Sequence, residues 1–110
     1  YRAHLKELVG PLLAPWQKAL GVQIGSWGVR KMKTKWGSCN PKTGHILFNL
    51  ELAKKPVQCL EYVVVHELAH LLIRKHDDRF LSLLDKHMPN WRQYRSELYA
   101  TPLGSEGWAE

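Results

Sequence analysis

Residues 66–70 read HELAH, with two histidines four positions apart and a glutamate directly after the first. On an α-helix His66 and His70 lie one turn apart on the same face, so both imidazoles can bind one metal ion. Zinc accepts neutral imidazole, and a catalytic zinc site uses three protein ligands and leaves one position for water. Glu67 points about 100° away around the helix axis, where its carboxylate can take a proton from that water without binding the ion. The motif therefore predicts one zinc ion per chain and Glu67 as the general base of a hydrolase.

The segments on both sides of the motif are apolar. Residues 63–65 are VVV and residues 71–73 are LLI, which predicts a buried helix. The alternative, an exposed stripe with both histidines in solvent, does not account for these flanks. Polar side chains on a buried helix need partners, and a bound metal ion supplies them.

The motif supplies two metal ligands, and the third must come from elsewhere in the chain. On a continuous helix His76 would lie about 9 Å beyond His70 and about 120° away around the axis. For His76 to join the site, the helix must end near residues 74–75, and because no glycine is present we expect an unusual backbone angle there. Asp77 is suited to cap the helix after such a break. Glu97, on a later helix, is the competing third ligand.

Several elements are expected to position these residues. Apolar spacing predicts a helix over residues 4–20, which Pro11 and Pro15 should split or kink and Gly21 should end. Residues 22–39 and 45–52 read as strands, joined into a hairpin by the turn 40–44, and Arg30, Met32, Thr34 and Trp36 are expected on one strand face. Helices are expected from Pro56 to about Arg74, over 79–88 behind Asp77, and after Pro89 through 90–100.

This order of elements predicts an α+β domain made of an N-terminal helix, a β-hairpin or small sheet, the helix with the motif and two further helices. The length of 110 residues suits a single domain, residues 1–110, with an irregular tail at 101–110. The chain starts at Tyr1 without a methionine, and we expect it to be the catalytic part of a longer protein.

The charge and the residue composition indicate which classes of partner the protein can bind. The formal charge is +6, and the basic residues cluster at Arg30, Lys31, Lys33, Lys35, Lys42, Lys54 and Lys55. Such a surface favours nucleic acid, nucleotides or acidic partners. No apolar run approaches the roughly 20 residues that span a bilayer, so no membrane partner is expected. Two cysteines are too few for a disulfide framework and favour a cytoplasmic location.

Three segments together resemble one family. HELAHLLIRKHDDRF resembles the zinc-peptidase segment of the YgjP-like metallopeptidases, which are related to the SprT-like proteases. KTKWGSCNPKTGHILFNLELA resembles the W-G-S-C hairpin of that family, and MPNWRQYRSEL resembles its following helix. The resemblance covers roughly residues 30–100. It implies a small zincin-like catalytic domain, with His66, His70 and His76 as zinc ligands and Glu67 as general base.

The site predicts a zinc-dependent hydrolase, and the resemblance makes it a metalloendopeptidase that acts on extended polypeptide. A peptidase of this kind binds its substrate as an extra strand, and we expect residues 45–52 to be the sheet edge that pairs with it. Trp36 and Asn49 flank the hairpin and are candidate substrate-binding residues. For the second donor to a transition-state oxyanion, the sequence does not choose among Tyr94, Tyr99, Arg92 and Arg95.

Two other functions compete with peptidase activity. The same chemistry directed at phosphorus would make a nucleotide or phosphoanhydride hydrolase, with phosphates held by Lys31, Lys33, Lys35, Lys54 and Lys55. A metal-stabilised adaptor that binds nucleic acid through the basic cluster would explain the charge. That third function gives Glu67 no role.

Overall fold

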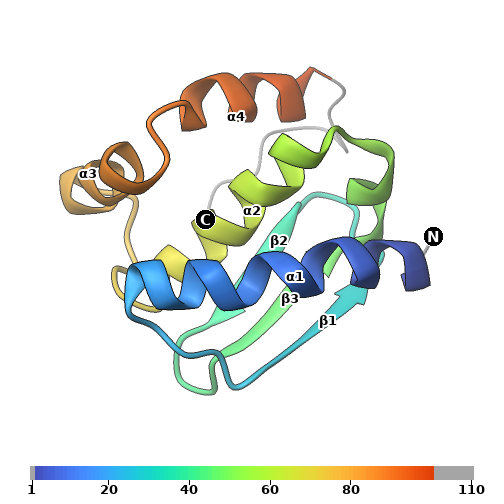
Figure 1. Ribbon diagram of the computed structural model, residues 1–110, viewed down its shortest axis with the longest axis horizontal. Coiled ribbons are helices and arrows are strands. Elements are labelled where there is room, and N and C mark those ends of the chain that lie inside the picture. Colours follow the sequence, from blue (N-terminus) through green and yellow to red (C-terminus); the bar gives the residue numbers. More distant parts are fainter. Residues whose placement is uncertain (1, 101–110) are drawn as a thin grey trace.

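The computed structural model describes residues 2–100, which form four α-helices, a short 3-10 helix and a three-stranded sheet (Figure 1). The elements are α1 (Arg2–Leu20), β1 (Ser26–Arg30), β2 (Gly37–Asn40), β3 (His45–Asn49), η1 (Leu50–Lys54), α2 (Val57–Ala69), α3 (Asp78–His87) and α4 (Trp91–Tyr99). This confirms the predicted α+β class and the order of helix, hairpin and three further helices. The tail 101–110, expected to be irregular, lies outside the described residues.

The sheet has the strand order β1-β3-β2. β2 and β3 form the predicted antiparallel hairpin, and β1 pairs with β3 in parallel, so that Trp27 lies opposite Ile46. Gly44 takes the left-handed conformation, with a φ of 73°, at the end of the hairpin turn. The prediction of residues 45–52 as the edge strand is wrong, because β1 covers the side of β3 that β2 leaves open. β3 is central, and β2 is an edge.

The prediction of strands over residues 22–39 is also only partly correct. β1 ends at Arg30, and residues 31–36 form a loop. Lys31, Lys33 and Lys35 are exposed in this loop, so a regular strand there would bury little apolar surface. The side chain of Asn49 holds the loop instead: its Nδ2 donates to the carbonyl of Met32 at 2.8 Å and to that of Lys35 at 2.6 Å.

Helix α1 is continuous through Pro11 and Pro15, so the predicted split does not occur. Both prolines are exposed, where water can satisfy the carbonyls that lose an N–H partner. The opposite face buries Leu5, Val9 and Leu13 at helical spacing. Gly21, with a φ of 71°, ends the helix as predicted.

Helix α2 is the central element, and every residue from Tyr62 to His70 is buried. It packs against α1 and β2 on one side and against α3 and α4 on the other (Figure 1). α2 ends at Ala69, earlier than the predicted end near Arg74. No described non-glycine residue has a positive φ, so the expected unusual angle at residues 74–75 is wrong. The chain leaves the helix through a right-handed turn in which Ile73 N–H donates to the Ala69 carbonyl at 2.9 Å.

The described helices offer no membrane-spanning segment, because none combines the length and the apolar character that a bilayer crossing needs.

Candidate metal centre

Three imidazoles meet at the C-terminal end of α2. The Nε2 atom of His66 lies 3.2 Å from those of His70 and His76, and the latter two are 3.0 Å apart. Two nitrogens bound to one tetrahedral zinc ion at about 2.0–2.1 Å would lie about 3.3 Å apart, so the separations fit a shared ion. Within residues 2–100 the group comprises these three histidines and no cysteine or carboxylate. Three protein ligands suit a catalytic rather than a structural zinc site.

The second ring nitrogen of two histidines is already engaged. Nδ1 of His70 lies 3.1 Å from the carbonyl of Ile73, which can only accept, so Nδ1 must carry the proton. Its Nε2 then keeps the lone pair that a metal needs. Nδ1 of His66 lies 3.3 Å from the hydroxyl of Tyr62, one turn earlier on α2. Because a hydroxyl can accept a hydrogen bond, Tyr62 is compatible with the same tautomer of His66.

His76 reaches the other two because α2 stops early and a new helix begins soon after. Asp77 caps α3 as predicted: its Oδ1 accepts from the backbone N–H groups of Arg79 at 3.1 Å and Phe80 at 3.2 Å. Partial burial, with a contribution from His70, lowers the pKa of His76. The lowered pKa favours the neutral imidazole that binds a metal.

Phe80 is a site residue that the sequence reasoning did not single out. Its ring, which is buried in α3, lies 4.6 Å from the His70 ring, 4.8 Å from His76 and 5.2 Å from His66 between centroids. It therefore supports all three imidazoles from one side. The signal in the sequence was the H-x-x-x-F spacing between His76 and Phe80, which places an aromatic residue in the first turn behind the cap.

Glu67 is fully buried, and β2 determines the space around its carboxylate. A Cβ atom placed on Gly37 would lie 2.9 Å from Oε2 and 3.0 Å from Cγ of Glu67, as well as 3.0 Å from Cγ1 of Val63. Any side chain at position 37 would therefore displace the glutamate. Gly37, in the first position of β2, was not predicted as a site residue.

Glu97, the competing third ligand, lies on α4, where its Oε1 accepts from Nε2 of Gln58 at 3.0 Å. It is not part of the histidine group. The structure thus brings His76, and not Glu97, next to His66 and His70.

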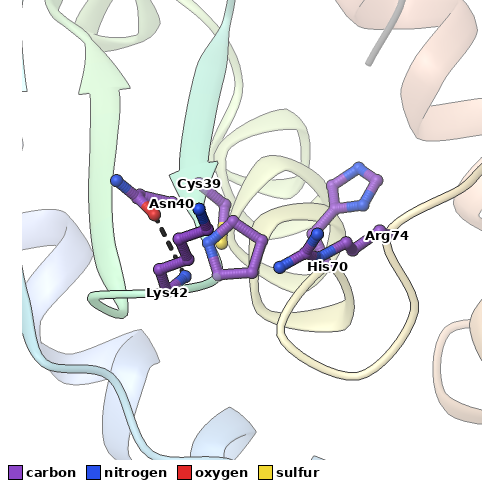
Figure 2. Close-up of a pocket in the computed structure, with 6 residues that line it drawn as sticks. Cys39, Asn40, Lys42, His70 and Arg74 are labelled. Atoms are coloured by element: carbon purple, nitrogen blue, oxygen red, sulfur yellow. Dashed lines mark hydrogen bonds between the residues drawn. The ribbon is translucent and has the colours of Figure 1, made fainter.

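A cavity of about 250 Å³ opens beside the histidines. It lies between the end of β2 with its hairpin turn and the end of α2 with the following loop (Figure 2). It is lined by Cys39, Asn40, Pro41, Lys42, His70 and Arg74.

The sequence over residues 1–101 matches the family model described as YgjP-like, metallopeptidase domain. The chain belongs to the YgjP-like family. No curated protein matches it significantly.

Two solved structures share the fold of this YgjP-like domain. One is the metallopeptidase zymogen of Pyrococcus abyssi abylysin, which is 23% identical with a TM-score of 0.76, over 84% of this chain and 92% of that one. The other is the metallopeptidase zymogen of Methanocaldococcus jannaschii jannalysin, which is 21% identical with a TM-score of 0.65, over 86% of this chain and 93% of that one. Both structures confirm the small α+β architecture.

Trp36 and Asn49 lie in the interior of this YgjP-like domain. Trp36 is 3% exposed and Asn49 is fully buried, with its amide bonded to the loop 31–36. The Oδ1 atom of Asn49 also accepts from the N–H of Glu51 at 3.0 Å and so caps η1. These contacts are structural, and substrate binding by either side chain stays a prediction.

None of the four candidate oxyanion donors lines the cavity beside His70. Arg92 donates to Asp85 at 2.7 Å and lies over the Trp91 ring, and Arg95 lies over the same ring. The ion pair of Arg92 with Asp85 joins α4 to α3, and the two contacts with the Trp91 ring lie within α4. The choice of an oxyanion donor remains untested.

Proposed function

We propose that this YgjP-like domain is a zinc metalloendopeptidase, in which His66, His70 and His76 hold one zinc ion and Glu67 is the general base. The observation that carries the proposal is the convergence of three Nε2 atoms within 3.2 Å of one another, at the C-terminal end of the helix that also holds Glu67. The family match supports the peptidase assignment.

When bound, zinc acts as a Lewis acid that polarises a carbonyl oxygen and lowers the pKa of water from 15.7 to about 7. Glu67 takes the proton from the attacking water as the bond to the scissile carbonyl carbon forms, and then delivers it to the leaving amine nitrogen. Burial of the carboxylate excludes competing water and strengthens its interaction with the proton it holds. Gly37 keeps the space in which that carboxylate lies.

The substrate of this proposal is an extended polypeptide. β2 is the sheet edge next to α2, since it pairs only with β3 among the described strands. An extended chain can pair with the backbone of such an edge, which aligns its peptide bonds with the neighbouring helix. β2 thus takes the role that the sequence analysis gave to residues 45–52.

The phosphoanhydride alternative has less support at the site. Its proposed phosphate ligands were five lysines, and none of them lines the cavity beside His70. Lys54 pairs with Glu51 at 3.1 Å, and Lys55 lies over the Trp36 ring. The basic loop 31–36 leaves nucleic-acid contact as an untested prediction.

Incubation of the zinc-loaded protein with denatured casein and, separately, with a panel of nucleoside triphosphates tests the proposal. We expect casein fragments, and a loss of more than about 100-fold in rate for Glu67→Gln, because the general base is removed while the ligands remain. The zinc content of both proteins is measured as the control. Release of phosphate that depends on Glu67, without cleavage of casein, would contradict the peptidase assignment.

A further inference from the structure

The cavity beside His70 is positively charged on two sides. Lys42, in the hairpin turn, and Arg74, in the loop after α2, both line it and are both exposed. Neither forms an ion pair with another residue of the described range. No aspartate or glutamate lines the cavity, so nothing in its wall neutralises the two cations. An anion that enters between them gains two attractive interactions.

A hydrogen bond at the end of β2 holds the turn that carries Lys42. Oδ1 of Asn40 accepts the backbone N–H of Lys42 at 3.0 Å, which fixes the hairpin turn beneath the lysine. Figure 2 shows Asn40 and Lys42 on the hairpin side and His70 and Arg74 on the helix side of the cavity. The two cations thus come from separate elements and face a common space.

The cavity lies beside the histidine group at which the proposed peptide hydrolysis takes place. His70 belongs both to the cavity wall and to the histidine group, so a ligand in the cavity lies next to the metal centre. A chain that pairs with β2 would reach the cavity at Asn40, the last residue of that strand. The anionic group that a polypeptide brings is a carboxylate.

We propose that this cavity is a substrate subsite in which Lys42 and Arg74 bind a carboxylate close to the scissile peptide bond. The carboxylate is that of an aspartate or glutamate side chain, because an endopeptidase cleaves its substrate away from the chain end. The inference rests on the proposed peptidase function and assigns a sequence preference to it.

A second cavity lies next to the first, and only the first is lined by two cationic side chains. It has a volume of about 490 Å³ and shares Pro41 and Lys42 with the first. Its remaining lining comes from residues 21–25, 43–44 and 71–72, and includes no further charged side chain. The carboxylate is therefore bound on the side of the shared wall that faces His70.

A binding experiment tests the subsite without depending on catalysis. Amide shifts of the ¹⁵N-labelled, zinc-loaded protein are followed while acetyl-Ala-Glu-Ala-amide or its glutamine counterpart is added. We expect shifts around residues 40–42 and 74 with the glutamate peptide, and binding at least about tenfold weaker with the glutamine peptide, because a charged hydrogen bond is lost. Acetyl-trialanine with a free or an amidated end distinguishes the chain-end carboxylate from the side chain.

Two variants complete the binding test. The double variant Lys42→Gln, Arg74→Gln should lose the response to the carboxylate. Lys33→Gln, which removes one exposed charge from the loop 31–36 outside both cavities, should keep it. Equal responses to glutamate and glutamine, or an unchanged response in the double variant, would overturn the proposal. A response to ATP but to neither carboxylate would also overturn it, in favour of phosphate recognition.

Cleavage sites in casein, mapped by mass spectrometry, separate this proposal from the proposed function. Acidic residues should be enriched at a fixed position near the cleaved bonds, and the double variant should lose that enrichment. Cleavage that ignores acidic residues would contradict the subsite while the peptidase stands. Carboxylate binding that depends on Lys42 and Arg74, in a protein that cleaves no peptide, would contradict the peptidase function while the anion site stands.

Discussion

Each histidine of the candidate metal centre is positioned by different contacts. His70 is fixed by the carbonyl of Ile73, three residues later, and His66 contacts the hydroxyl of Tyr62, four residues earlier. His76 is positioned by the turn after α2, by the cap at Asp77 and by the ring of Phe80. His66 lies within α2 and His70 caps the end of that helix, whereas His76 lies in the loop that follows. The effect of removing each side chain on zinc binding should therefore differ in size.

Replacement of the histidines one at a time should reveal this difference. Zinc should be present at about one ion per chain, be lost in His66→Ala and His70→Ala, and be weakened in His76→Ala. Inductively coupled plasma mass spectrometry after dialysis measures the content. Glu97→Ala is the matched control, since its carboxylate bonds to Gln58 away from the site. Release of zinc from Glu97→Ala with retention in His76→Ala would show that the third ligand is misassigned.

Tyr62→Phe tests the contact behind His66. Removal of the hydroxyl leaves the buried ring and its stacking on Trp91 in place, but takes a hydrogen-bond partner from Nδ1. We expect zinc affinity to fall by about 10-fold or more, the range seen when a partner behind a ligand is removed. Competition with a chromophoric chelator measures the affinity. Tyr94→Phe, which removes the same atom from α4, should have no such effect, and equal affinities in all three proteins would show that Tyr62 only fills space.

At the scale of elements, the contact between β2 and α2 sets the position of Glu67, the proposed general base. Gly37 begins the strand, and its missing side chain is the space occupied by the Glu67 carboxylate. The W-G-S-C segment therefore shapes the space around Glu67 through its backbone at Gly37 as well as through its side chains.

Gly37→Ala should separate the base from the metal ligands. The added methyl group would contact Oε2 at 2.9 Å, so Glu67 must move, while the atoms nearest to that methyl group belong to Glu67 and Val63 and to none of the histidines, which should therefore keep zinc. Overpacking of this kind costs about 1–3 kcal/mol, and a displacement near 1 Å costs about 100-fold in rate. Casein cleavage, zinc content and thermal unfolding are measured together.

Gly28→Ala is the matched control for this substitution. Gly28 also lies in a strand, but a Cβ there meets only Cδ2 of Leu47 at 3.6 Å, an ordinary contact. Its activity should stay close to that of the unmodified protein. If Gly37→Ala were as active as Gly28→Ala, the strand would not position the base.

At the scale of the whole molecule, the histidine group lies between the end of α2 and the start of α3 and contacts the core at Tyr62 and Phe80, while most of the core lies elsewhere. The core contains buried residues from every helix and from the sheet, including Leu5, Phe48 and Leu98. The fold should therefore persist without metal, while zinc adds stability by binding only the folded state.

Thermal unfolding against zinc concentration tests this division. Zinc at 100 times its dissociation constant should stabilise the fold by about 2.7 kcal/mol. For a domain of this size that corresponds to a rise of roughly 10–20 °C in Tm. His70→Ala should remove the rise and leave the metal-free Tm little changed. Unfolding of the metal-free protein at room temperature would show that the core alone does not hold the chain.

Local patterns in the sequence predicted much of this molecule. Asp77 and Gly21 marked helix ends because capping and left-handed turns depend on neighbouring residues alone. The pairing of β1 with β3 was not predicted, since it joins segments about 19 residues apart and leaves no local signal. The end of α2 at Ala69 was missed for a similar reason, because the packing of Phe80 on the histidines overrides the helical pattern of residues 70–74.

The exposed edge of β2 also bears on how the protein behaves at high concentration. A strand at the edge of a sheet that can accept a peptide can equally accept the same edge of a second molecule, which is a route to aggregation. β2 is only four residues long, and Lys35 before it and Pro41 and Lys42 after it bracket the edge. Short length, like charge and a proline oppose growth of a shared sheet. These features favour the proposed pairing of the edge with a single extended chain over its pairing with a second copy of the domain.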